Sequence, residues 1–237
     1  MSGLALLTFA RCIGFVFKAP GFSHPSVPPM LRAGIALVLT VGLTPAIGSG
    51  RTANGAALVV AIASELGIGA AIGIAASMLY DGAYAGGRAL DDYVGIRGSV
   101  PNAELFAASG FGRIWSLALL AGFFLLDGYR IVIVTFARSF QQIPPGGAIA
   151  LHGLYQLGIA LPRLIIEAAL LVAGPAIALT FVLQITLGAI TRVVPRFASF
   201  TLSFPIVFGG AIIATAIAVP LVFPIAARPW LYLPFLR

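Results

Sequence analysis

The sequence predicts an all-α, polytopic membrane protein built from bent, proline-interrupted helices and helical hairpins. Hydrophobic residues make up 60% of its 237 residues and charged residues only 9%, and the mean hydropathy is +1.06. A water-soluble domain of this length needs far more polar surface. The apolar runs are long and lack the period-two alternation of membrane β-strands. Several runs carry a proline or a charge near the middle, which is costly in lipid and indicates contact with protein or water.

A transmembrane helix needs about 20 apolar residues, so four to six spans would use nearly the whole chain. The apolar segments lie at about 4–17, 30–47, 56–94, 114–140, 151–190 and 197–225.

The first three segments have clear boundaries. Lys18-Ala19-Pro20-Gly21 ends the first, and Pro29 stands where proline favours the start of the second. The third is close to twice a normal span, so we expect one long helix or a helix that bends at Gly86-Gly87. The spacing Gly69-x-x-x-Gly73 within it predicts close packing against another helix.

The last three segments are interrupted. The fourth has Asp127-Gly128-Tyr129-Arg130 at its centre, and 141–147 is a firm break after it. Pro162 and Pro175 predict that the fifth consists of two stacked helical pieces. The sixth follows a polar turn at 191–196.

The charge pattern excludes several functions. The chain has 14 Lys and Arg against seven Asp and Glu, but its cations are scattered singly, so we expect basic loops near lipid headgroups and no nucleic-acid partner. The histidines His24 and His152 are far apart and form no His/Glu helical pair, so no metal or other cofactor is predicted. Ser109-Gly110 is a weak match to a hydrolase motif, and no phosphate-binding loop is present.

Five charges fall inside apolar segments, and they allow two interpretations. Either they pair structurally within the fold or between subunits, or Glu65, Asp127 and Glu167 face one cavity of a small-molecule or ion transporter. Asp127 and Arg130 have the i,i+3 spacing of a helical pair. The five charges are Arg11, Glu65, Asp127, Arg130 and Glu167.

The loop at 97–113 is rich in small residues and contains Leu105, Phe106 and Phe111. Such a segment can form an apolar constriction that gates a pore by excluding water. An ordinary surface loop with two buried anchors explains the same residues equally well.

Taken in order, several motifs resemble the FliR/SctT family, the R-type subunit of the flagellar export gate and its T-type counterpart in injectisomes. The resemblance covers nearly the whole chain. It is carried by Ala10-Arg11, Ala19-Pro20, Pro29-x-x-Arg32, Glu65-Leu-Gly67-Ile-Gly69, Leu126-Asp127-Gly128-Tyr129, Ser139-Phe140, Ile143-Pro144-Pro145-Gly146, Gly188-x-x-x-Arg192-x-x-Pro195, Phe200 and Phe204-Pro205.

The resemblance implies a non-enzymatic, pore-forming subunit of a type III protein export gate. Such a subunit would assemble with P-type and Q-type subunits and the switch (B/U-type) subunit in the bacterial inner membrane, with the gate protruding to the periplasmic side. Unfolded secretion substrates would pass through it. The resemblance also implies a P-type-like part at 1–147 and a Q-type-like hairpin with a short tail at 148–237.

The same resemblance assigns site residues. By position, a loop that plugs the pore corresponds to 97–113, with Pro101, Leu105, Phe106 and Phe111 as candidates. Polar or structural contacts, some between subunits, are expected at Arg11, Glu65, Asp127, Arg130, Arg192, Thr201, Ser203 and Pro205.

Overall fold

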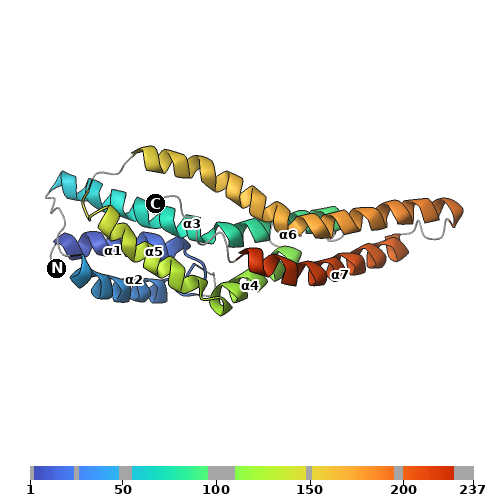
Figure 1. The fold of residues 1–237 in the computed structure, drawn as a ribbon, viewed down its shortest axis with the longest axis horizontal. Coiled ribbons are helices and arrows are strands. Elements are labelled where there is room, and N and C mark those ends of the chain that lie inside the picture. Colours follow the sequence, from blue (N-terminus) through green and yellow to red (C-terminus); the bar gives the residue numbers. More distant parts are fainter. Residues whose placement is uncertain are drawn as a thin grey trace. The chain divides into compact units, whose positions relative to one another are not determined.

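The computed structural model describes residues 3–23, 27–47, 55–95, 110–147, 151–194 and 200–226, and all regular structure in these residues is helical. The predicted all-α fold is therefore confirmed (Figure 1). The elements are α1 (Gly3–Lys18), α2 (Pro29–Leu43), the short 3₁₀ helix η1 (Thr44–Ala46), α3 (Ala56–Val94), α4 (Gly110–Leu125), α5 (Gly128–Gln142), α6 (Leu151–Val193) and α7 (Phe200–Ala226).

Most predicted boundaries agree with these helices. Pro29 occupies the first turn of α2, as its fixed φ favours, and α3 is one continuous helix through Gly86-Gly87. The prediction of two stacked pieces around Pro162 and Pro175 is wrong, because α6 runs through both prolines without a break. Proline's φ of about −65° is itself helical, so a long packed helix can continue past the missing N–H.

Two described helices are long and apolar enough to cross a membrane. They are α3 and the part of α6 at Ile165–Val193, and α4 with α5 would make a third if this bent pair forms one span. The described residues thus hold two or three candidate spans, whereas the sequence predicts four to six over nearly the whole chain. α1 with 16 residues and α2 with 15 are shorter than the about 20 residues that a span needs.

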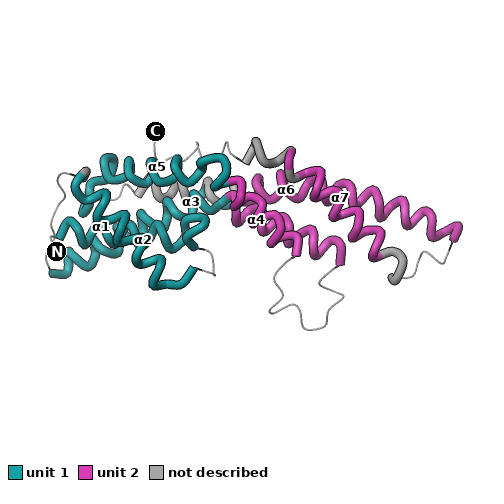
Figure 2. Tube along the Cα trace, turned by 90° about the horizontal axis from the view of Figure 1, so that it is seen from below, with its two compact units in different colours: residues 1–78, 123–162, 229–237 teal, residues 79–122, 163–228 magenta. Residues whose placement is uncertain are grey.

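The chain divides into two compact units, coloured teal and magenta in Figure 2. Unit 1 comprises residues 1–78, 123–162 and 229–237, and unit 2 comprises 79–122 and 163–228. In unit 1, the rings of Phe15 in α1 and Phe136 in α5 stack with centroids 4.2 Å apart. In unit 2, Gly82 and Gly86 of α3 lie against Ala168 and Ala169 of α6.

The expected fourth helix is split into α4 and α5 by a bend of 74°. Asp127 lies at the bend with φ 56°, in the left-handed region, which Asp tolerates better than most non-glycine residues. The next residue, Gly128, has no room for a side chain, because a Cβ there would lie 2.6 Å from the Phe123 ring. The Asp-Gly pair therefore fixes the bend.

We expect Asp127→Gly to be nearly neutral and Asp127→Val to destabilise the protein. Glycine adopts positive φ without steric cost and should leave the free energy of unfolding within about 1 kcal/mol of the original. Valine is β-branched and should lower it by about 1–3 kcal/mol. Unfolding followed by circular dichroism in detergent would measure both, and a valine variant as stable as the glycine variant would contradict the strain at this bend.

Candidate functional site

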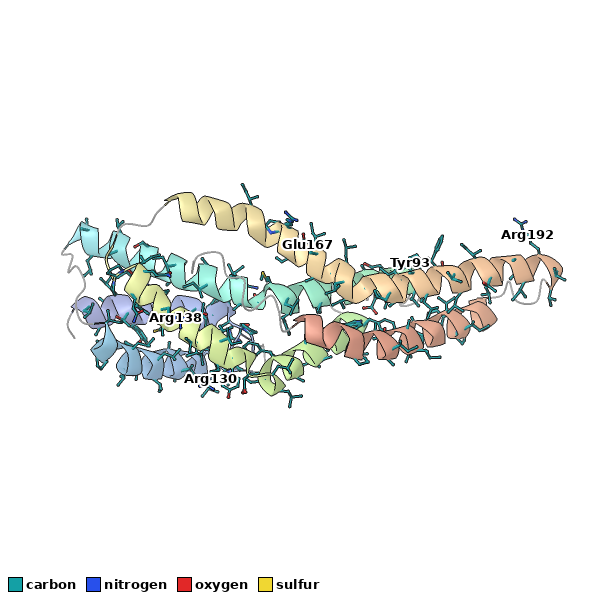
Figure 3. The ribbon with its side chains drawn as sticks, viewed as in Figure 1. Tyr93, Arg130, Arg138, Glu167 and Arg192 are labelled. Atoms are coloured by element: carbon teal, nitrogen blue, oxygen red, sulfur yellow. The ribbon has the colours of Figure 1, made fainter. Side chains whose placement is uncertain are left out.

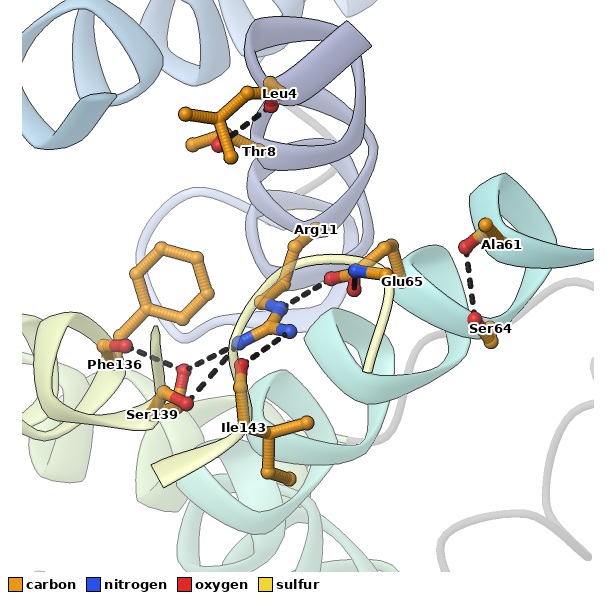
Figure 4. Close-up of polar contacts among 10 residues, drawn as sticks. Leu4, Thr8, Arg11, Ala61, Ser64, Glu65, Phe136, Ser139 and Ile143 are labelled. Atoms are coloured by element: carbon orange, nitrogen blue, oxygen red, sulfur yellow. Dashed lines mark hydrogen bonds and ion pairs between the residues drawn. The ribbon is translucent and has the colours of Figure 1, made fainter. Parts of the chain in front are cut away.

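A buried ion pair joins α1 to α3 in unit 1. Arg11 and Glu65 both have fully buried side chains, and Arg11 Nε donates to Glu65 Oε2 at 2.5 Å (Figure 4). Two opposite charges removed from water are stable only when their remaining hydrogen-bonding groups are also satisfied. The surroundings of the pair therefore decide what it can do.

The end of α5 and the turn after it supply these hydrogen bonds. Arg11 Nη1 donates to the Ser139 carbonyl oxygen at 3.2 Å, and Nη2 donates to the Ile143 carbonyl oxygen at 2.9 Å. The Gly146 N–H donates to Glu65 Oε1 at 2.9 Å. The guanidinium also lies over the Phe140 ring, 4.4 Å from its centroid. We call Arg11, Glu65, Ser139, Ile143 and Gly146 the Arg11–Glu65 cluster.

The Arg11–Glu65 cluster acts as a structural joint. All three guanidinium nitrogens donate and both Glu65 oxygens accept, so neither charge is left for a ligand. A cation at the C-terminal end of α5 also interacts favourably with the helix dipole. The cluster thus holds α1, α3 and the turn after α5 in one arrangement.

A seam of glycines allows α1 and α3 to approach closely enough for this pair. A Cβ on Gly69 would collide with the Arg11 carbonyl oxygen, and one on Gly14 would collide with the Leu66 carbonyl oxygen. A Cβ on Gly73 would lie 2.7 Å from the Phe15 carbonyl oxygen. The close packing predicted from Gly69-x-x-x-Gly73 is confirmed, and its partner is α1.

A second buried carboxylate holds the start of α4 in unit 2. Asp91 of α3 is 1% exposed, and its Oδ1 accepts a hydrogen bond from the Phe111 N–H at 3.1 Å. Gly87 and Gly112 meet there with no space for a Cβ. Phe111 is 3% exposed and its ring makes an edge contact with Phe208 of α7 at 5.9 Å. The carboxylate satisfies a free N–H of the first helical turn, where negative charge is favoured.

The other sequence-predicted residues are distributed as follows. Asp127, Arg130, Arg192 and Pro205 are exposed, and the contact given between Asp127 and Arg130 is the main-chain hydrogen bond from Arg130 N–H to Asp127 O, 3.0 Å long. Glu167 pairs with Arg163 on the exposed surface of α6 at 2.7 Å. Thr201 and Ser203 lie in α7, but their side chains are outside the described residues, as are Pro101, Leu105 and Phe106.

Sequence reasoning missed Ser139, Ile143, Gly146 and Asp91 as members of these two sites. Of the four hydrogen bonds described in the Arg11–Glu65 cluster, three involve a main-chain oxygen or N–H. Main-chain groups are the same in every residue type, so the sequence carries no signal of these contacts. Gly146 has φ 75°, and its place after two prolines was the one available signal of a special turn. In the part of the chain that the structure describes, no group of three or more His, Cys, Asp or Glu could hold a metal ion.

The fold and these sites define a helical membrane protein whose buried charges serve its own packing. The chain belongs to the bacterial export proteins, family 1, whose model matches residues 3–231. It is similar to the flagellar biosynthetic protein FliR of Escherichia coli K12, with 24% identity over 90% of this chain and 83% of that protein. It is equally similar to FliR of Pectobacterium carotovorum, with 24% identity over 92% and 85%. The chain is thus a component of a bacterial protein export apparatus and not an enzyme.

Proposed function

We propose that the chain is a pore-forming core subunit of a type III protein export gate, which passes unfolded proteins across the bacterial inner membrane. The observation that carries this proposal is the family match over residues 3–231. The names of the two FliR relatives support the flagellar branch, and an injectisome counterpart is the alternative.

The helices support a role inside a larger assembly. α2 is too short to span a bilayer alone, yet it exposes 70% of Val38 and 68% of Val41. Apolar faces of this kind on short helices need cover from neighbouring protein. In our proposal, P-type, Q-type and switch subunits bury these exposed apolar side chains, in a gate that protrudes to the periplasmic side. Within it, 1–147 forms the P-type-like part and 148–237 the Q-type-like hairpin, with Arg192, Thr201, Ser203 and Pro205 at subunit contacts.

The segment 97–113 is proposed to plug the conduit. Its candidates Pro101, Leu105 and Phe106 are outside the described residues. Phe111 is described at the start of α4, where it is buried, its N–H donates to Asp91 and its ring contacts Phe208. We therefore assign Phe111 to the base of the plug and the other three to the plug itself.

Deletion of residues 103–110, or the substitution Phe106→Ala, should make assembled gates leaky to small ions, because an apolar constriction excludes water only while it is filled. Ion conductance of membranes containing the assembled gate would measure the leak. Phe181→Ala is the matched control, since this α6 side chain is 53% exposed and has no part in the plug. Unchanged conductance in a correctly assembled deletion variant would reject the plug.

The transporter alternative has less support from the residues it needs. Glu65 would have to bind and release ions, but both its oxygens already accept hydrogen bonds from Arg11 and Gly146. Glu167 is engaged by Arg163 at an exposed surface. A solute-specific uptake defect in a Glu65→Gln variant that still assembles and secretes would restore this alternative.

A further inference from the structure

The outward side of α5 forms a cationic surface in a chain that is otherwise mostly apolar. Arg130, Val134, Arg138, Gln141 and Gln142 are all exposed, and we call them the α5 outer face. Figure 3 shows Arg130 and Arg138 on α5. The two arginines are eight residues apart, or about 12 Å along a helix, and α5 contains no acidic residue.

The opposite side of α5 is buried by packing within unit 1. Val132, Phe136 and Phe140 are 0–3% exposed, and Phe136 stacks on Phe15 of α1. A helix that lies in a membrane interface needs a free apolar face to insert between the lipids. The free face of α5 carries arginines instead, and arginine in hydrocarbon is costly. The hydrocarbon interior of a membrane is therefore a poor occupant of the α5 outer face.

The described carboxylates leave this face with a net positive charge. Asp127, which is exposed at the N-terminal end of α5, places one negative charge near Arg130 against the two arginines. Glu65 is engaged by Arg11, Glu167 by Arg163, and Asp91 caps α4. Among the described contacts, none joins a carboxylate to the side chain of Arg130 or Arg138. A second copy of the chain would present the same two positive charges, and like charges placed opposite each other repel. The complementary occupant is a different protein that presents negative charge.

We propose that the α5 outer face docks an acidic segment of another subunit of the export apparatus, with carboxylates spaced about two helical turns apart to pair with Arg130 and Arg138. This inference rests on the proposed function, because it requires that the chain work within a multi-subunit gate. Val134 lies between the two arginines and is 43% exposed, so it would lie at the centre of the contact.

The test is charge reversal in the complete apparatus. The double variant R130E/R138E should co-purify with the other gate subunits at a level reduced on the order of tenfold or more, while the chain itself remains folded because both side chains are exposed. R130K/R138K keeps both charges and should retain most of the assembly. Arg88→Glu reverses an exposed arginine on α3 and should leave assembly unchanged.

A photo-crosslinking residue at position 134 should form an adduct with a peptide of another gate subunit that contains Asp or Glu. Changing those acids to lysine should restore assembly to R130E/R138E. Adducts with lipid alone or with a second copy of the chain would overturn the proposal, as would wild-type assembly of R130E/R138E. Deletion of the gene separates the two proposals: if secretion continues without the chain, the proposed function fails, and otherwise only the docking surface is at stake.

Discussion

Replacing Glu65 with alanine is expected to lower the free energy of unfolding by about 3–5 kcal/mol, because the Arg11 guanidinium then stays buried without a counter-charge. Arg11 is fully buried and its position is set by the glycine seam between α1 and α3, so it cannot move out to water without separating the helices. Most domains are stable by only about 5–15 kcal/mol, so this loss would remove a large part of the total stability. The variant should accumulate poorly in the membrane.

Two further variants separate the charge from the packing. Glu65→Gln keeps the shape and one acceptor oxygen, so its effect should lie between those of wild type and alanine. The double variant R11M/E65L replaces the pair with apolar side chains of similar length and should recover much of the loss. Thermal unfolding of the purified protein in detergent would rank the three. An alanine variant within about 0.5 kcal/mol of wild type would show that the pair is not needed for the fold.

The second large effect is expected at Gly69. A Cβ at this position would collide with the main-chain carbonyl of Arg11, which cannot rotate away as a side chain can. Gly69→Ala should therefore push α1 from α3 and cost about 1–3 kcal/mol or more, and Gly69→Val should cost more still. The same shift would lengthen the Arg11–Glu65 contact, so this variant and Glu65→Ala should not be additive.

Gly67 provides the control on the same helix. A Cβ on Gly67 would meet no atom within 4 Å, so Gly67→Ala should stabilise α3 by about 0.5–1 kcal/mol through helix propensity alone. The midpoint of thermal unfolding should fall for Gly69→Ala and rise for Gly67→Ala. This pair of results would confirm that the glycines of α1 and α3 bring the two backbones into contact. If Gly69→Ala also raised the midpoint, α1 and α3 would not be in backbone contact.

The sequence was sufficient to predict the elements but not their long-range partners. Hydropathy and the proline and glycine positions predicted α1, α2 and α3 to within a few residues, since these signals act locally. The partnership of Arg11 with Glu65 spans 54 residues and depends on carbonyl groups of the turn after α5. Residue types do not indicate the direction of a main-chain carbonyl. The sequence therefore identifies Arg11 and Glu65 as unusual charges but does not predict that they pair with each other.

The errors also have local causes. Pro162 and Pro175 predict breaks, although each proline removes only one backbone donor and a continuous α6 contains both. Conversely, the apolar run 114–140 predicts one helix, and Asp127 divides it by adopting a positive φ. Positive φ is uncommon even for Asp, so a bend of 74° at this position is weakly encoded beside the strong apolar signal of its neighbours.

The lengths of α3 and α6 have a consequence for the biogenesis of the protein. With 39 and 43 residues, they rise about 58 and 65 Å along their axes, roughly twice the 30 Å of a bilayer's hydrocarbon. Lipid cannot cover both ends of such a helix at once, yet Ile159 and Val193, about 51 Å apart along the axis of α6, are each more than half exposed. A newly synthesised copy therefore needs its sister polypeptides soon after insertion, and an orphan copy should be a preferred target of membrane quality-control proteases.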